Sequence, residues 1–188
     1  MKNALIILDR DGVLNKLLIR PNGSTDSPMT TNEIEIFPWV SEQLKILSQL
    51  KYGLIIATNQ PAAAKGKISQ SELINIHFEI ELRSGVFLAP CICLHRAEDN
   101  CECRKPKTGL LEEAFRKYSS FNKKYSWMVG DRATDVIAGH NFGLKTALLG
   151  PSVIRDMDIL KEKNILPTFH GKDLRDFVEH IMAYHDIL

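Results

Sequence analysis

Short apolar runs alternate along this chain with segments whose apolar residues recur every three or four positions. Each run has the length of a β-strand, and most are apolar throughout, as in strands buried on both faces. The runs span residues 4–8, 53–58, 86–94, 125–129 and 144–149. Helical spacing predicts α-helices over residues 40–50, 69–82, 110–118, 131–141 and 173–185. Strands and helices in alternation form βαβ units, so the pattern predicts an α/β fold, a Rossmann-like parallel sheet with helices on both faces.

Two polar stretches do not fit this alternation. Residues 16–32 follow the first predicted strand and contain Pro21-Asn-Gly-Ser24, and residues 90–108 follow the start of the third strand. In a doubly wound sheet both would leave the carboxyl ends of strands, which is the edge where ligands of such sheets bind. We therefore expect both loops to contribute to a functional site.

Composition narrows the class of protein. The chain has 188 residues, 44% of them hydrophobic and 25% charged, which predicts a single domain over 1–188 and excludes a disordered, collagenous or coiled-coil chain. The formal net charge of +1 gives no reason to expect a nucleic-acid partner. The apolar runs are too short to cross a membrane, and the first of them, Ala4–Leu8, is too short for the core of a secretory signal. We expect a monomeric cytoplasmic protein.

The cysteines are clustered. Cys91, Cys93, Cys101 and Cys103 lie within 13 residues, with His95 among them. Since the cytoplasm keeps thiols reduced, a metal site is favoured over disulfides, and Cys93, His95, Cys101 and Cys103 could surround a structural Zn²⁺ ion. Cys91 is left over, either as a core residue or as a competitor of Cys93. Four buried free cysteines are the alternative interpretation.

Acidic residues stand where two buried strands end. Asp9 and Asp11 follow the first strand, and Asp131 and Asp135 follow the strand that ends near Val129. On an extended strand Asp9 and Asp11 would point to the same side, where their charges would repel and favour a divalent cation such as Mg²⁺. Spacing alone fits a solvated turn equally well. The second pair of acids favours a shared cation.

Groups suited to an anion accompany these acids. Thr58-Asn59-Gln60 ends the second strand with a hydroxyl, an amide and backbone N–H groups, which suits phosphate. Arg104 and Lys105 follow the last cysteine of the cluster. By itself this basic run could be a solvated turn, but beside a Mg²⁺ site it indicates a phosphate clamp.

These motifs, in this order, resemble those of the haloacid dehalogenase (HAD) superfamily. They are Asp-x-Asp-Gly-Val at 9–13, Thr-Asn-Gln at 58–60, Cys-Arg-Lys-Pro at 103–106 and Gly-Asp-x-x-x-Asp at 130–135. The resemblance covers about Leu5–Gly150 and is narrower to the histidinol-phosphatase-like branch, which carries a similar Cys/His loop. It implies a HAD fold without a large cap domain. The zinc loop of 91–103 and the loop of 16–32 would then shape the substrate entrance.

The resemblance also implies a mechanism and a role for each site residue. Asp9 would attack phosphorus to give an aspartyl-phosphate, and Asp11 would act as general acid and then as general base. Mg²⁺ would be held by the carboxylates of Asp9 and Asp131 and by the backbone carbonyl of Asp11, with Asp135 outside the direct ligands. The transferring phosphoryl group would be bound by Thr58, the backbone of Asn59 and Lys105, while Arg104 would contact the rest of the substrate.

The substrate implied is a small sugar phosphate. The run Ala64-Lys65-Gly66-Lys67 and Asn15 favour a heptose 1,7-bisphosphate, dephosphorylated at position 7, although Pro61 and Ala62 depart from that pattern. Arg132 and the short cysteine loop favour histidinol phosphate instead. A polynucleotide 3′-phosphatase and a non-catalytic zinc-bearing binding domain are more remote alternatives. Retention of Asp9, Asp11 and Asp131 together argues against a non-catalytic domain.

Overall fold

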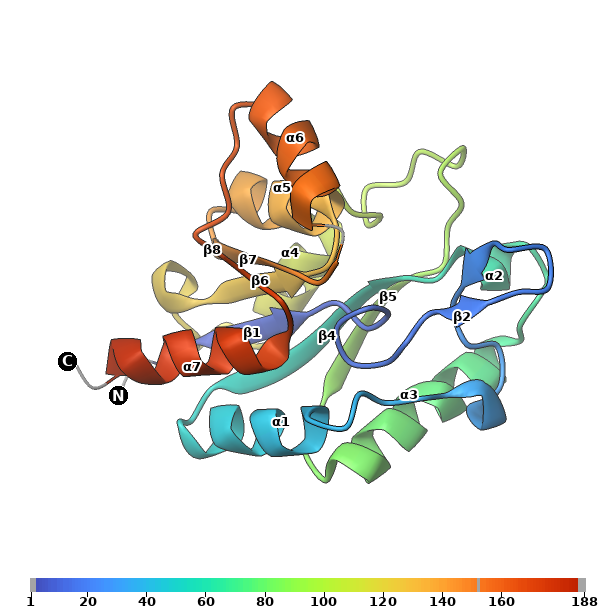
Figure 1. The fold of residues 1–188 in the computed structure, drawn as a ribbon, viewed down its shortest axis with the longest axis horizontal. Helices are drawn as coiled ribbons and strands as arrows, with labels where there is room; N and C mark the ends of the chain where they lie inside the picture. The colour runs from blue at the N-terminus through green and yellow to red at the C-terminus, as the bar shows by residue number, and fades with distance from the viewer. Residues whose placement is uncertain (1–2, 152, 186–188) are drawn as a thin grey trace.

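Six parallel strands form one sheet at the centre of the molecule (Figure 1). The computed structural model describes residues 3–151 and 153–185. In spatial order the strands are β5 (Ala89–Cys93), β4 (Gly53–Asn59), β1 (Leu5–Leu8), β6 (Trp127–Gly130), β7 (Lys145–Leu149) and β8 (Phe169–Gly171). The chain first moves outward from β1 to one edge and then returns to β6 on the other side of β1. This reversal makes the gap between β1 and β6 the topological switch point, at which ligands of doubly wound sheets bind.

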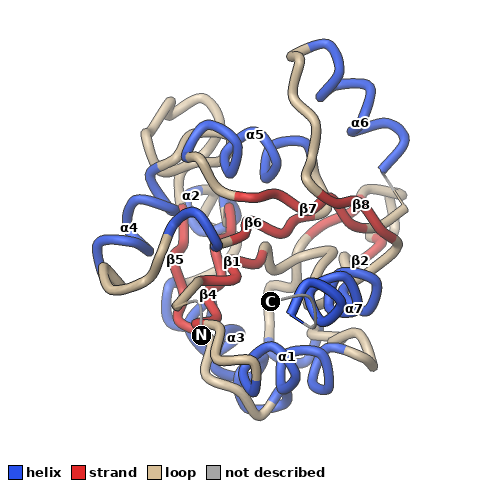
Figure 2. The backbone as a smooth tube through the Cα atoms, turned by 90° about the vertical axis from the view of Figure 1, so that its left-hand side faces the viewer, coloured by secondary structure: helices blue, strands red, loops and turns tan. Residues whose placement is uncertain are grey.

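Helices cover both faces of the sheet, as the alternating pattern predicts (Figures 1 and 2). One face carries α1 (Val40–Gln49), α3 (Gln70–Ser84) and α7 (Leu174–His185), and the other carries α4 (Gly109–Lys117), α5 (Ala133–Phe142) and α6 (Val153–Glu162). A short helix, α2 (Pro61–Ala64), follows β4. Among the described residues no helix is both long enough and apolar enough to span a bilayer.

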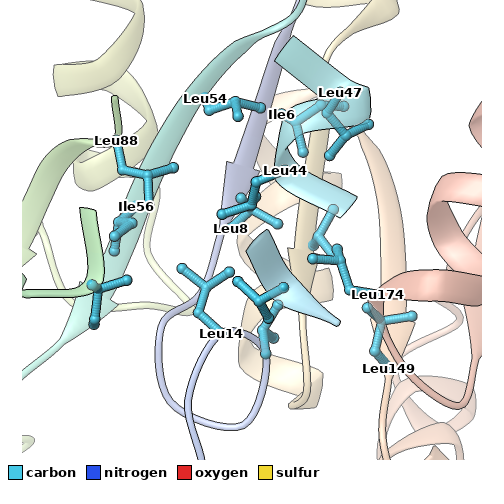
Figure 3. Close-up of a cluster of buried hydrophobic side chains, with 14 of the residues drawn as sticks. Ile6, Leu8, Leu14, Leu44, Leu47, Leu54, Ile56, Leu88, Leu149 and Leu174 are labelled. Atoms are coloured by element: carbon cyan, nitrogen blue, oxygen red, sulfur yellow. The ribbon is translucent and has the colours of Figure 1, made fainter. Parts of the chain in front are cut away.

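The two faces of the sheet are supplied by alternate residues of the same strands. Ile6 and Leu8 of β1 pack with Leu44 and Leu47 of α1, and the close-up in Figure 3 shows this cluster. Leu5 and Ile7 join the opposite cluster. Because successive side chains of a strand point to opposite faces, a strand covered on both sides must be apolar throughout.

Several boundaries and elements differ from the prediction. β5 begins at Ala89 rather than at residue 86, because α3 ends at Gly85 in the left-handed conformation (φ 69°) and Phe87 in the following turn is 68% exposed. The helix α6 and the edge strand β8 were not predicted. In α6, Val153, Met157 and Leu160 pack in one small cluster, whereas the apolar Ile154 and Ile159 are exposed and obscure this spacing in the sequence.

The segment after β1 forms a small flap. Within it, β2 (Leu18–Ile19) and β3 (Thr25–Asp26) pair antiparallel, and a 3₁₀ turn (Thr31–Glu33) leads toward α1. Arg20 Nη1 contacts Glu33 Oε1 at 2.7 Å and ties the hairpin to the 3₁₀ turn. In the described part of this segment there is no larger inserted unit, in keeping with the expectation of a HAD fold without a large cap.

Candidate functional site

A cavity of about 470 Å³ opens at the carboxyl ends of β1, β4 and β6. Its lining combines the acids after β1 and β6, the end of β4, the basic run after the cysteine cluster, and the strand β3 with the residue after it. The sequence-predicted residues that line it are Asp9, Asp11, Thr58, Asn59, Arg104, Lys105, Asp131 and Asp135. Segments far apart in the chain therefore meet at the switch point of the sheet.

Three of the acids form one group. Asp9, Asp131 and Asp135 each offer a carboxylate oxygen, and these atoms lie within 4.8 Å of one another. Asp135 lies in the first turn of α5, and its Oδ2 accepts a hydrogen bond from the backbone N–H of Arg132 at 3.1 Å. Carboxylate oxygens are ligands that Mg²⁺ prefers, so this group could hold that ion.

The charges of this group are poorly compensated by the protein. Burial, together with Asp135 and Asp9, raises the pKa of Asp131 from 3.8 to about 8. Burial also raises the pKa of Asp135, to about 6, although Lys105 opposes the rise. Three carboxylates face one lysine, so a divalent cation fits the donor set and the charge of the site.

Gly12 allows the chain to pass close to Asp131. Its φ is +88°, and a Cβ at this position would collide with the Asp131 carboxyl group. A residue with a side chain would have to adopt a left-handed conformation and displace an acid of the group.

Lys105 is a buried cation with fixed partners. Its side chain is 1% exposed, and Nζ lies 3.1 Å from Asp9 Oδ1 and 2.5 Å from Asp135 Oδ1. The third partner is the carbonyl oxygen of Ala57, at 2.7 Å. The Ala57 carbonyl accepts a hydrogen bond from Nζ, whereas the two acids are its ion-pair partners. Despite burial, the two neighbouring acids raise the pKa of Lys105 above 10.5, so it stays charged.

Asn59 connects the end of β4 to the basic run. Its Nδ2 donates to the carbonyl of Lys105 at 3.2 Å, and its Oδ1 accepts from the backbone N–H of Lys105 at 3.1 Å. The side chain of Asn59 is therefore engaged with the loop that carries Lys105. The peptide bond between Lys105 and Pro106 is cis.

The carboxylate of Asp11 lies apart from those of the other three acids. It does not belong to the group formed by Asp9, Asp131 and Asp135. The expectation that Asp9 and Asp11 project together from an extended strand is wrong, because β1 ends at Leu8 and the chain turns at Arg10, whose carbonyl accepts from the N–H of Leu14 at 2.8 Å. Burial raises the pKa of Asp11, but the Arg10 charge and its hydrogen bonds outweigh burial and lower the pKa below 3.8.

The cysteine cluster also comes together. The Sγ atom of Cys93 lies 3.6 Å from that of Cys101 and 3.2 Å from that of Cys103, and Cys101 and Cys103 are 3.5 Å apart. Nδ1 of His95 lies 3.2 Å from Cys103 Sγ and 3.7 Å from Cys93 Sγ. Around a tetrahedral zinc ion, ligand atoms lie about 3.5–3.8 Å apart, whereas a disulfide needs about 2.0 Å. The four side chains therefore fit a metal site and not a disulfide.

Cys91 is a core residue. It lies in β5 opposite Ala57 of β4, is 1% exposed and packs in the apolar cluster beneath α4. Burial raises its pKa to about 11. Of the two roles left open for Cys91 by the sequence, the structure supports the first.

The lining of the cavity includes residues that the sequence did not single out. Thr25 and Asp26 form the strand β3, Ser27 follows it, and Thr134 comes from the start of α5. These residues could not be identified from the sequence, because a Thr-Asp-Ser run in a polar loop is not typical of any functional motif. They reach the cavity only through contacts between segments that are distant in the chain.

Comparisons with known proteins agree with these features. A model of the HAD-hydrolase-like family matches residues 102–177. The chain is 30% identical over 149 residues to a D-glycero-beta-D-manno-heptose-1,7-bisphosphate 7-phosphatase of Neisseria meningitidis, covering 77% of this chain and 76% of that protein. It is 31% identical over 176 residues to the histidine biosynthesis bifunctional protein HisB of Actinobacillus pleuropneumoniae, covering 89% of this chain and 45% of HisB. The chain spans less than half the length of the first curated relatives it matches.

A solved structure is similar over nearly the whole chain. The D,D-heptose 1,7-bisphosphate phosphatase of B. bronchiseptica, complexed with magnesium and phosphate, superposes with a TM-score of 0.80 at 26% identity. The match covers 98% of this chain and 99% of that one. The similarity therefore includes both the sheet and the loops around the cavity.

Proposed function

Since this chain belongs to the HAD-like hydrolase family, in the branch of the heptose-bisphosphate and histidinol-phosphate phosphatases, we propose that it is a Mg²⁺-dependent phosphomonoester hydrolase. The observation that carries the proposal is the convergence of Asp9, Lys105 and Asp131 on one cavity at the switch point of the sheet, with Asp11 at its wall. The cavity is polar and cationic on one side and acidic on the other, as a site for a metal-bound phosphate requires.

Asp9 is the proposed nucleophile. Its side chain is 14% exposed and lines the cavity, and Lys105 lies beside one of its oxygens. A carboxylate oxygen of Asp9 attacks phosphorus and the bond from phosphorus to the leaving alkoxide breaks. Asp11, which is ionised before substrate binds, takes up a proton from solvent when the phosphate anion binds beside it, and it gives that proton to the leaving oxygen. Water then attacks the aspartyl-phosphate, Asp11 takes the proton of that water, and Asp9 is released with inorganic phosphate.

Magnesium would be held by the carboxylates of Asp9 and Asp131 and by the backbone carbonyl of Asp11. When bound, it would offset the repulsion between the nucleophile and the anionic substrate. Asp135 supplies an oxygen to the same group of acids and is a further ligand candidate. The magnesium and phosphate in the similar B. bronchiseptica enzyme support this assignment.

The phosphoryl oxygens would be bound by Thr58, the backbone of Asn59 and Lys105. All three line the cavity, and Lys105 is fixed by Ala57 and Asp135 so that its charge remains in place when the nucleophile reacts. A fixed ammonium needs little reorganisation as charge develops on the phosphoryl group.

Zinc is proposed to bind to Cys93, His95, Cys101 and Cys103. The metal would act on the site indirectly, through the loop that holds Arg104 and Lys105. Arg104 Nη1 donates to the carbonyl of His95 at 3.2 Å, so the zinc-bound segment supports the basic run. A structural zinc ion with four protein ligands stabilises the fold and leaves no open position for substrate.

Heptose 1,7-bisphosphate, losing its 7-phosphate, is the proposed substrate. Arg104 and Arg132 both line the cavity and make no ion pair with an acidic side chain among the described residues. Two such guanidinium groups suit a substrate that carries a second phosphate. Histidinol phosphate is the second candidate, because Asp26 also lines the cavity and its carboxylate could bind an ammonium group.

Three broader expectations are also kept as proposals. Residues 1–188 form a single domain, supported by one continuous sheet with apolar clusters on both faces. The enzyme is monomeric, and it acts in the cytoplasm on a small phosphorylated substrate.

The test is a panel of phosphate-release assays with Mg²⁺. It compares heptose 1,7-bisphosphate, histidinol phosphate and a 3′-phosphorylated oligonucleotide, and it uses Asp9→Asn as the inactive control. We expect the highest kcat/KM with the bisphosphate. A higher kcat/KM with histidinol phosphate would favour the second candidate substrate. Absence of phosphate release from every phosphomonoester would refute the hydrolase assignment.

A further inference from the structure

The carboxylate of Asp11 accepts five hydrogen bonds. Oδ1 accepts from Arg10 Nε at 3.1 Å and from Asn15 Nδ2 at 2.9 Å. Oδ2 accepts from Arg10 Nη2 at 2.9 Å, from Ser27 Oγ at 2.8 Å and from Gln60 Nε2 at 2.7 Å. Both oxygens are therefore fixed, and the carboxylate cannot rotate about its Cβ–Cγ bond without losing several of these contacts.

Arg10 fixes the plane of this carboxylate. Two nitrogens of its guanidinium bind the two oxygens of Asp11, which is the bidentate geometry that a planar fork favours. Arg10 is 0% exposed, and Asp11 is its only ion-pair partner among the described residues. Burying an arginine is costly unless it is paired, so the pair is held together strongly.

The helix α3 closes the space behind Arg10. His77 of α3 is 6% exposed, and burial followed by the Arg10 charge lowers its pKa to about 3. The imidazole is therefore uncharged. It is not an acidic group that could form an ion pair with Arg10 in place of Asp11.

Gln60 holds Asp11 from a different strand end. It follows β4, is 1% exposed, and its Nε2 donates both to Asp11 Oδ2 and to Thr58 Oγ1, the latter at 2.9 Å. One amide group thus connects the proposed acid to the hydroxyl proposed to bind the phosphoryl group. The Gln60 side chain therefore holds the Asp11 carboxylate and the Thr58 hydroxyl at a fixed distance from each other.

We propose that Arg10 and Gln60 are positioning residues that aim Asp11 at the leaving-group oxygen. The cavity is lined by Asp11 but by neither Arg10 nor Gln60, so both would act through Asp11 without touching the substrate. Proton transfer depends steeply on the geometry of the donor and the acceptor, and a carboxyl group free to rotate would spend little time in the productive orientation. The inference rests on the proposed phosphatase function.

A comparison of leaving groups tests this role. The alkoxide released from a sugar phosphate needs the proton of Asp11, whereas p-nitrophenolate leaves readily without it. We expect Arg10→Met and Gln60→Leu each to lower kcat for the sugar phosphate by about 10- to 100-fold, a part of what general acid catalysis contributes. For p-nitrophenyl phosphate we expect less than about threefold loss, since Asp9 and Lys105 are unchanged. Gln60→Leu removes only a hydrogen bond that Thr58 Oγ1 accepts, and the Thr58 hydroxyl keeps its own hydrogen to donate to phosphate.

Two further variants make the test specific. Arg10→Lys keeps the charge but lacks the planar fork, so it should recover only part of the activity on the sugar phosphate. Arg83→Met removes an arginine from the surface of α3, where Arg83 pairs with Glu79, and should leave both activities unchanged. Melting temperature and zinc content report whether each variant is folded.

The outcomes separate the inference from the function on which it rests. Equal losses on both substrates in a folded variant would show a merely structural role and overturn the inference, as would no loss on either. If Arg10→Met does not fold, Gln60→Leu decides the matter by itself, because it leaves the Arg10–Asp11 pair in place. Wild-type protein that hydrolyses neither substrate would instead refute the proposed function.

Discussion

Replacing Asp131 by asparagine should stabilise the metal-free protein at neutral pH. In the folded state the pKa of Asp131 is raised from 3.8 to about 8, first by burial and then by the charges of Asp135 and Asp9. A folded-state pKa above the unfolded value favours folding at low pH. That advantage is lost as the pH rises from about 4 to 8, because the unfolded chain releases the proton first.

The expected loss of stability follows from the size of the rise in the pKa of Asp131. At about 1.4 kcal/mol per pH unit, the wild-type protein without magnesium should lose roughly 4 kcal/mol by pH 7 relative to pH 4 from this group. Asparagine has nearly the same shape and no charge, so Asp131→Asn should remove this slope.

The assay is urea denaturation followed by the fluorescence of Trp127, which is 2% exposed and becomes solvated on unfolding. The buffers are magnesium-free and span pH 5 to 8, and Asp158→Asn, at a 68% exposed side chain, is the matched control. Magnesium at 100 times its Kd should restore about 2.7 kcal/mol to the wild type and much less to the variant.

The reasoning would be refuted if the free energy of unfolding of the metal-free wild type did not fall between pH 5 and 8. It would be refuted equally if Asp131→Asn were no more stable than the wild type at pH 8. Either result would mean that burial and the neighbouring acids do not raise the pKa of Asp131 in the folded protein.

Three other substitutions have defined outcomes. Asp9→Asn should abolish phosphate release without changing the melting temperature by more than a few degrees, and measurable turnover by this variant would contradict its role as nucleophile. Cys103→Ser should reduce zinc content and lower the melting temperature by about 5–10 °C, corresponding to about 2–3 kcal/mol, whereas Cys91→Ala should keep its zinc. Gly12→Ala should lower both stability and Mg²⁺ affinity, because its left-handed φ and the nearby Asp131 exclude a Cβ. Calorimetric titration with Mg²⁺ would measure the second effect, and unchanged affinity would argue against this close packing.

The central strands were predictable because their chemistry is local. Leu5–Leu8 and Trp127–Gly130 are buried on both faces, so each residue had to be apolar or small, and this pattern is visible without knowledge of the partners. The cap of α3 was equally local, since Ser69 Oγ accepts from the N–H of Glu72 at 3.0 Å. By contrast, β8 has only three residues at the sheet edge and exists because it pairs with β7.

Some parts of the candidate site could likewise be predicted from the sequence, and others could not. Asp9, Asp131 and Lys105 could be identified because they stand at strand ends or in a short basic run, and the family resemblance assigned their roles. The partners of Asp11 could not be identified as a set. Ser27 is 16 positions away from Asp11 along the chain and Gln60 is 49, and nothing in either neighbourhood indicates a contact with this carboxylate.

The sequence by itself determined which central strands are buried and which donor atoms follow their carboxyl ends, because burial on both faces and the polar residues after a strand are visible in residues near in the chain. It also determined that three thiols and one imidazole could reach one metal ion, because they share a loop. Only the tertiary structure decided that Asp135 joins Asp9 and Asp131, that Lys105 is buried between two of these acids, and that Asp11 is held apart by Arg10 and Gln60. These arrangements depend on the order of strands in the sheet, and that order brings together side chains whose charges interact only once the chain has folded.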